Sequence, residues 1–113
     1  MHELSIITSI LDVVEEQARL NGAKVVNTIE IEVGELAGVE IPSLEFCYDA
    51  ARTDTLAAKA NLVIHVIEGR GHCPDCDKDV PLEYFIAPCP ECGDTLVEAS
   101  QGRELRIKSI DVD

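Results

Sequence analysis

The 113-residue chain is poor in basic and in aromatic side chains. It has 9 Lys and Arg against 22 Asp and Glu, a formal net charge of −13, and it contains two Phe, two Tyr and no Trp. An excess of carboxylates repels phosphate backbones and anionic lipid surfaces, so the composition argues against a nucleic-acid or membrane partner. With so few aromatic residues, any core must be built from Ile, Leu, Val and Ala.

Long apolar runs are also missing. No stretch approaches the roughly 20 apolar residues that a membrane-spanning helix needs. The first 20 residues carry Glu3, Asp12, Glu15 and Glu16, where a secretion signal would have a basic start and an uninterrupted apolar block. We therefore expect a cytoplasmic protein, in which the five cysteines are metal ligands or core residues rather than disulfides.

Apolar periodicity predicts the first two elements. From Leu4 to Leu20, apolar residues recur at three- and four-residue steps, which is typical of an amphipathic helix, and Gly22 is suited to end it. Residues 25–36 alternate between apolar and acidic side chains, so they predict a strand with one buried face and one solvated face.

Three further elements follow. Residues 41–55 predict a second helix with Pro42 near its first position and with Leu44, Cys47 and Ala51 on the buried stripe. Residues 61–69 are apolar on both sides, which favours a strand in the centre of the sheet, and residues 102–113 alternate again as a third strand. The predicted fold is α+β, with two helices on a small three-stranded mixed sheet.

An insertion between the last two strands contains the most informative motif. Cys73-x-x-Cys76 is followed after twelve residues by Cys89-x-x-Cys92. Two such knuckles direct four thiolates at one centre, and about 30 residues cannot bury enough apolar surface to fold without a metal ion. We expect a structural zinc-ribbon-like domain over residues 70–99, inserted into a domain formed by residues 1–69 and completed by residues 100–113.

The spacing leaves some alternatives open. The same cysteines are compatible with two labile disulfides, a redox Cys-x-x-Cys pair or a rubredoxin-like iron centre. A short hairpin through Leu82, Tyr84 and Ile86 is expected to bring the second knuckle over the first. Two Gly-containing crossings, at residues 69–71 and 100–102, predict a hinge next to the insert.

The remaining cysteine and two of the histidines have simpler interpretations. Cys47 is expected to be a small buried hydrophobe, because no His is placed beside it in sequence to activate it. His65 lies in an apolar strand and is expected to be a core or edge residue. His72 precedes the first knuckle, as an exposed neighbour of the metal centre or as an auxiliary ligand.

The amino terminus MHE offers a second kind of metal site. His2 is too bulky for the usual removal of the initiator Met, so we expect the α-amine of Met1 to be the true terminus. That amine, the amide nitrogen of His2 and its imidazole Nδ1 can close fused chelate rings, with Glu3 within reach. Closely spaced nitrogens suit Ni(II) or Cu(II), and affinity should fall below neutral pH because these groups must lose their protons.

Taken together, these segments resemble the HypA/HybF family of nickel-insertion proteins. The start MHELSI, the stretch IEIEVGELAGVEIPSLEFCYDA, the knuckles GHCPDC and PCPECG, and the closing GRELRIKSIDV carry the resemblance. It implies a nickel-binding α/β domain with nickel held by His2, Met1 and Glu3. It also implies zinc bound by four cysteines, Cys73, Cys76, Cys89 and Cys92.

The resemblance further implies a metallochaperone and not an enzyme. Its partners would be a HypB-type GTPase and the precursor of the [NiFe]-hydrogenase large subunit, in some organisms with urease as a further client. We expect a monomer or weak homodimer. A zinc-stapled adaptor that transfers no nickel is the alternative function, ahead of a zinc-ribbon nucleic-acid module and of a hydrolase or redox enzyme.

Overall fold

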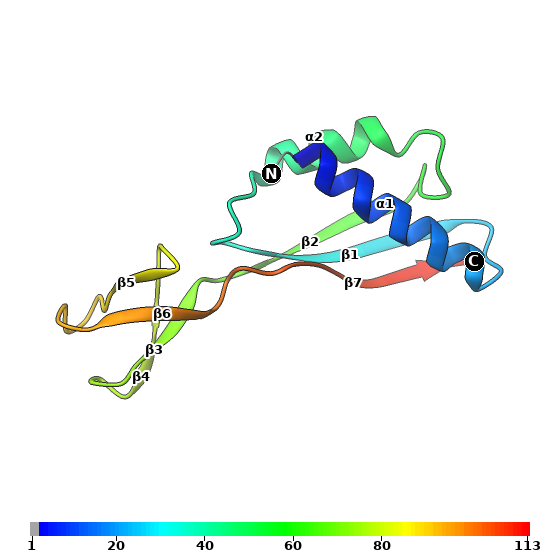
Figure 1. The fold of residues 1–113 in the computed structure, drawn as a ribbon. Coiled ribbons are helices and arrows are strands. Elements are labelled where there is room, and N and C mark those ends of the chain that lie inside the picture. The colour runs from blue at the N-terminus through cyan, green and yellow to red at the C-terminus, as the bar shows by residue number, and fades with distance from the viewer. Residues whose placement is uncertain (1–2) are drawn as a thin grey trace. The chain divides into compact units, whose positions relative to one another are not determined.

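The structure is a computed structural model that describes residues 3–113 and divides the chain into two compact units. The first unit comprises Met1–Ile31, Val39–His65 and Arg106–Asp113, and the second comprises Glu32–Gly38 and Val66–Leu105. Figure 1 shows the two helices over one face of the three-stranded sheet. The same figure also shows the shorter strands, which belong to the cysteine segment. Among residues 3–113, no helix is long and apolar enough to cross a bilayer.

The two helices of the first unit pack against each other. Helix α1 spans Glu3–Leu20 and buries six apolar residues at three- and four-residue steps, which confirms the amphipathic helix predicted for residues 4–20. It ends as expected at Gly22, which has a φ of 69°, and the Ala23 amide donates to the Ala18 carbonyl at 2.9 Å.

Helix α2 spans Ile41–Ala51 and is shorter than the predicted 41–55. Leu44 is buried as predicted and Ala51 is half-buried, but Tyr48, which was not placed on the predicted stripe, is buried as well. The Tyr48 hydroxyl donates to the Ala60 carbonyl at 2.8 Å, which lets the ring be buried with its polar end satisfied. Cys47 is left half-buried.

The three-stranded sheet is mixed, as predicted. It has the order β2-β1-β7, formed by β1 (Val26–Gly34), β2 (Asn61–Ile67) and β7 (Leu105–Val112). The Lys24 amide, just before β1, donates to Asp113 after β7, so β1 and β7 run antiparallel. The Glu35 amide, just after β1, donates to Ile67 at the end of β2, so β1 and β2 run parallel.

The central strand is β1 and not the strand at residues 61–67. Ile29, Ile31 and Val33 of β1 are buried, as predicted from the alternation. The central position predicted for the 61–69 strand was wrong, because β2 is at the edge and exposes Val63 and Val66. Its apolar residues on both sides were misleading, since apolar side chains also occur on exposed surfaces.

The cysteine segment forms a second, antiparallel sheet. Its order is β4-β3-β6-β5, with β3 (Arg70–Cys73), β4 (Lys78–Pro81), β5 (Ile86–Pro88) and β6 (Leu96–Gln101). Each knuckle is the turn of its own hairpin, β3–β4 or β5–β6. The predicted hairpin through Leu82, Tyr84 and Ile86 was wrong, because that stretch joins the two outer strands, which do not pair.

Three glycines bring backbones of the second unit into direct contact. A Cβ on Gly34 would lie 2.0 Å from the carbonyl oxygen of Gly102, and a Cβ on Gly102 would lie 2.7 Å from the Cα of Gly69. Arg70 pairs with Gln101 in the β3–β6 ladder. The two Gly-containing segments at residues 69–71 and 100–102 therefore lie side by side and pair with each other as strands. Hinge motion at these segments stays a prediction.

Candidate metal centre

The two knuckles bring four thiols together inside the second unit. Cys73 ends β3 and Cys76 follows in the turn, while Cys89 follows β5 and Cys92 precedes β6. The Sγ atoms of Cys73 and Cys92 are 3.9 Å apart, as are those of Cys76 and Cys89. All four Sγ atoms lie within 4.8 Å of one another, the one group of this kind found among residues 3–113.

These separations fit a tetrahedral metal ion and not disulfides. A Zn–S bond of about 2.3 Å at tetrahedral angles places neighbouring sulfurs about 3.8 Å apart, close to the 3.9 Å seen here. A disulfide needs a bond of about 2.05 Å, and all four cysteines are free thiols. Four cysteines would fill every position of a zinc ion, which leaves no open position for water or substrate.

The turns of the two knuckles adopt the same local conformation. Gly93 follows the second cysteine of one knuckle with a φ of 71°, and Asp77 occupies the matching position of the other with a φ of 51°. The Gly93 amide donates to the Cys89 carbonyl at 2.8 Å. Asp is one of the few residues other than Gly that adopt this left-handed conformation at modest cost. The structural role of Asp77 was not predicted, although the repeat Cys-Pro-x-Cys marks its position in the sequence.

The thiols differ in how readily they ionise. Desolvation, reinforced by the neighbouring thiols, raises the pKa of Cys76 to about 12. A hydrogen bond from the Cys92 backbone amide lowers the pKa of Cys89. Four adjacent thiols cannot all carry negative charge without a cation, and a bound metal ion supplies the positive charge that deprotonates coordinating thiols. The donor set therefore suits a divalent metal.

A small apolar core surrounds the sulfurs. Buried Val80, Leu82, Ala87 and Val97 pack with the two buried thiols, Cys73 and Cys89. Cys76, Cys92 and Ala99 are only partly buried against this cluster, so the second unit has little apolar burial of its own. Its stability should depend on the metal ion.

His72 lies beside the first knuckle but outside the thiol cluster. Its ring is exposed, with Nδ1 3.2 Å from an Asp79 oxygen and Nε2 3.4 Å from an Asp77 oxygen. Both ring nitrogens thus face carboxylates. A role for His72 as an auxiliary metal ligand remains a prediction.

The other predicted residues lie in the first unit. His65 is on the edge strand β2, where its Nε2 is 2.7 Å from Glu30 Oε1. Glu3 opens α1 and lines a pocket of about 430 Å³ together with Leu4, Phe46 and Cys47. Met1 and His2 lie outside the described residues.

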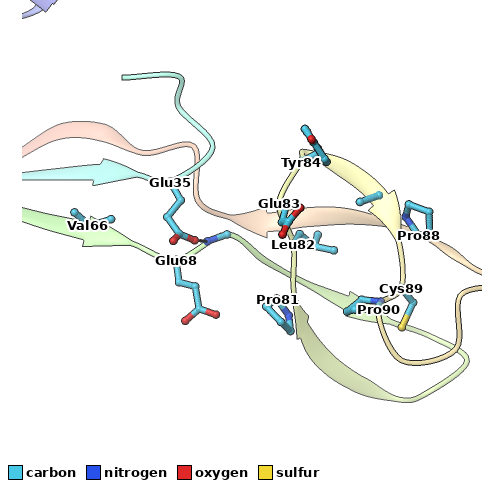
Figure 2. A pocket seen from close by; sticks show the side chains of 12 residues that line it. Glu35, Val66, Glu68, Pro81, Leu82, Glu83, Tyr84, Pro88, Cys89 and Pro90 are labelled. Atoms are coloured by element: carbon cyan, nitrogen blue, oxygen red, sulfur yellow. Dashed lines mark hydrogen bonds between the residues drawn. The ribbon is translucent and has the colours of Figure 1, made fainter. Parts of the chain in front are cut away.

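A larger pocket in the second unit was also missed. It has a volume of about 800 Å³ and lies between the end of β2 and the segment around β5 (Figure 2). Its lining includes the exposed ring of Tyr84 and three prolines, Pro81, Pro88 and Pro90. An aromatic residue among prolines in a chain so poor in aromatics was the signal available in the sequence.

Comparison with known proteins gives a consistent result. Residues 1–112 match a family model described as "Hydrogenase/urease nickel incorporation, metallochaperone, hypA". The hydrogenase maturation factor HypA of Parabacteroides distasonis is 50% identical over 110 residues, covering 97% of this chain and 96% of that protein. HypA of Chlorobium luteolum is 43% identical over 113 residues, covering 100% of this chain and 97% of that protein.

The fold agrees with the sequence comparison. The solution structure of the Ni metallochaperone HypA from Helicobacter pylori superposes with a TM-score of 0.68 at 26% identity, covering 99% of this chain and 97% of that one. The match therefore extends over both the first and the second unit. With a family match over almost every residue, relatives up to 50% identical and the same fold, this chain belongs to the HypA family of hydrogenase maturation nickel metallochaperones.

Proposed function

We propose that this chain binds Ni(II) at its amino terminus and delivers it for assembly of the [NiFe]-hydrogenase active site. The observation that carries the proposal is the nickel-incorporation family match, which begins at residue 1 and runs to residue 112. The proposed ligands are His2, the α-amine of Met1 and Glu3. Their closely spaced nitrogens suit the geometry that Ni(II) prefers.

Delivery requires a site that can release its metal. A short terminal chelate offers few ligands, so the acceptor protein can replace them one at a time by ligand exchange. Nickel is therefore cargo in this proposal. The chain acts as a metallochaperone and not as a catalyst.

The four cysteines have a different proposed role. Cys73, Cys76, Cys89 and Cys92 would hold a structural Zn(II), whose chemistry is to cross-link the two hairpins. The sulfur separations of 3.9 Å support this assignment. We further propose that residues 70–99 act as an inserted zinc domain, with residues 1–69 and 100–113 forming the nickel domain.

Delivery also requires partners. We propose a HypB-type GTPase and the hydrogenase large-subunit precursor as partners, urease maturation as a second client, and a monomer or weak homodimer as the working state. The proposed compartment is the cytoplasm, where thiols stay reduced and available to a metal. These proposals rest on membership of the family.

The delivery proposal can be tested by complementation. In cells that lack this chain, the untagged protein should restore nickel to the purified hydrogenase large subunit, whereas His2→Ala should not. His65→Gln is the matched control, because it removes a histidine that is not a proposed ligand. If His2→Ala restores nickel loading as well as the unaltered chain does, the protein acts as an adaptor and the delivery proposal is wrong.

A further inference from the structure

The pocket beside Tyr84 combines apolar walls with an acidic lining. We call it the Tyr84 pocket, formed by residues of the second unit only. Val66 and Tyr84 are 54% and 69% exposed, although both are apolar or aromatic, and buried Leu82 and Ala87 also line the pocket. Figure 2 shows Val66 and two glutamates on the β2 side, and Tyr84 and Pro88 on the β5 side.

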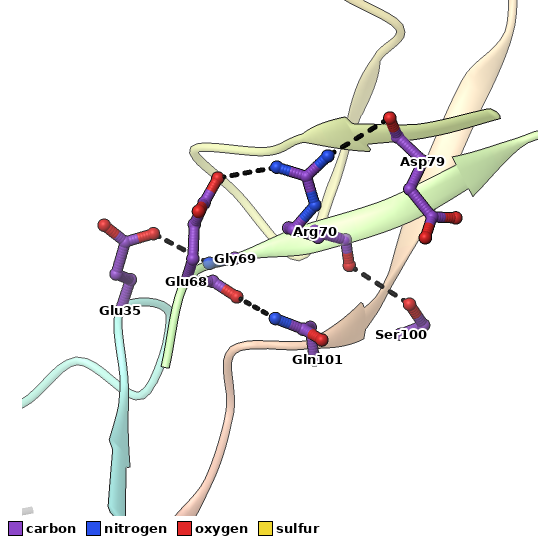
Figure 3. A network of polar contacts seen from close by, with 7 residues as sticks. All are labelled: Glu35, Glu68, Gly69, Arg70, Asp79, Ser100 and Gln101. Atoms are coloured by element: carbon purple, nitrogen blue, oxygen red, sulfur yellow. Dashed lines mark hydrogen bonds and ion pairs between the residues drawn. The ribbon is translucent and has the colours of Figure 1, made fainter. Parts of the chain in front are cut away.

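Three carboxylates line the same pocket. Glu35 accepts a hydrogen bond from the Gly69 amide at 2.7 Å, and Glu68 pairs with Arg70 at 2.8 Å (Figure 3). Glu83 is exposed and makes no hydrogen bond or ion pair within the described part of the chain. No Lys or Arg is among the lining residues. Arg70 offsets only one of the three carboxylates, Glu68, so the pocket keeps a net negative charge from Glu35 and Glu83.

An arginine side chain matches both properties. Its aliphatic stem packs on apolar surface while its guanidinium stays at the polar rim, and the planar head binds carboxylates and stacks on aromatic rings. The second unit already contains such a contact, since the Arg103 guanidinium lies 4.3 Å from the centre of the Phe85 ring.

The size and position of the pocket favour a segment over a single residue. Its volume is about 800 Å³. Sites that enclose a whole ligand have volumes of roughly 300–1,000 Å³, so this pocket falls within that range. Strand β5 is an outer strand of its sheet, so an extended chain has room to run beside it. Prolines in the walls are rigid, which reduces the entropy lost when a partner binds.

We propose that the Tyr84 pocket binds an extended, arginine-containing segment of a partner protein. The guanidinium would lie against Glu68 and Glu83 with its stem on Tyr84, and an aliphatic neighbour would contact Val66. Opposite charge and the apolar walls carry the proposal. It goes beyond nickel delivery and does not depend on the amino-terminal chelate.

The test uses the zinc-loaded full chain and a synthetic peptide of alternating Arg and Leu. Amide resonances of Val66, Tyr84 and their neighbours should shift on titration. Replacing each Arg by citrulline, which has nearly the same shape and no charge, should weaken binding at least about tenfold, because the charge-assisted bonds are lost. Equal affinity of the two peptides would overturn the proposal.

Variants separate the pocket from the general negative charge of the chain. Tyr84→Ala should weaken binding about tenfold, as expected for an aromatic anchor, and Glu68→Gln with Glu83→Gln should weaken it and reduce its salt dependence. Leu96→Ala and Glu98→Gln are matched controls on exposed β6 positions that do not line the pocket. Equal losses in the controls would contradict the proposal.

Two further measurements keep the outcome clear. Each variant should retain its zinc content and its far-ultraviolet circular dichroism, so that loss of binding is not loss of folding. His2→Ala should bind the peptide as tightly as the unaltered chain. Failure of nickel binding and failure of the pocket proposal are thus distinguishable.

Discussion

The Sγ atoms of Cys73 and Cys92 lie 3.9 Å apart, although the two residues belong to different hairpins. Cys76 and Cys89 make the equivalent contact between the same hairpins. The thiol cluster therefore lies where the turns of the β3–β4 and β5–β6 hairpins contact each other. A metal ion at this point would cross-link both hairpins.

Removing the metal should unfold the second unit. Structural zinc contributes about 10–16 kcal/mol of binding free energy in zinc-finger peptides, which matches or exceeds the total stability of about 5–15 kcal/mol of a typical domain. Purified protein should contain one zinc per chain by elemental analysis. A strong chelator, or Cys92→Ser, should collapse the amide dispersion of residues 70–101 in NMR spectra. Retention of those resonances without metal would contradict a structural role.

Asp77 should tolerate glycine but not a β-branched residue. Gly and Asn can adopt its φ of 51°. Replacing Asp77 by Val should lower the free energy of unfolding by about 1–2 kcal/mol. Asp77→Gly and Asp77→Val are compared by urea unfolding. Asp77→Asn is the control for the lost charge beside His72. A stable Asp77→Val protein would show that the left-handed turn is not required.

Gly34→Ala should be far more damaging than Gly38→Ala. A Cβ at Gly34 would lie 2.0 Å from a backbone oxygen, so we expect a loss of about 3 kcal/mol or more. A Cβ at Gly38 meets nothing within 4 Å, and only its φ of 73° is unfavourable, at a cost of about 1–2 kcal/mol. Thermal unfolding of the two variants gives the comparison. Equal losses would contradict the close packing of Gly34 on Gly102.

Glu30 should make the first unit more stable at neutral than at acidic pH. A hydrogen bond from His65, with a second from Ser109, lowers the pKa of Glu30 below its usual value of 4.5. The stabilisation is present above the unfolded-state pKa and is lost as pH falls through the lower folded-state pKa. Glu30→Gln should therefore lower the melting temperature at neutral pH and have a smaller effect at acidic pH, below the folded-state pKa of Glu30. A loss of equal size at both pH values would indicate packing and not charge.

The sequence predicted best where one pattern decided the structure. The apolar stripe of α1, the alternation of β1 and the cysteine spacing were each sufficient, because burial of one face or binding of one ion leaves few alternatives. Strand order was harder to predict, since the apolar residues of β2 indicate a strand but not its neighbours. The end of α2 was also missed: residues 52–55 form a turn, in which the Thr55 amide and hydroxyl both donate to the Arg52 carbonyl.

The site was predictable to different degrees. The thiol cluster contains the four predicted cysteines. Two knuckles at this spacing can bring four thiols together in only one compact arrangement, so the pattern was sufficient to predict it. Asp77 was missed because its role depends on a backbone angle. The Tyr84 pocket was missed because Val66 and Tyr84 reach it from separate elements.

Nickel binding at a free amino terminus is the central claim, and equilibrium nickel titration tests it most directly. Untagged, zinc-loaded protein should bind stoichiometric Ni(II), with an absorption band typical of a square-planar site. His2→Ala should abolish this binding, and a tag fused before Met1 should impair it because it converts the chelating amine into an amide. Stoichiometric nickel binding by His2→Ala with the native amino terminus intact would contradict the account.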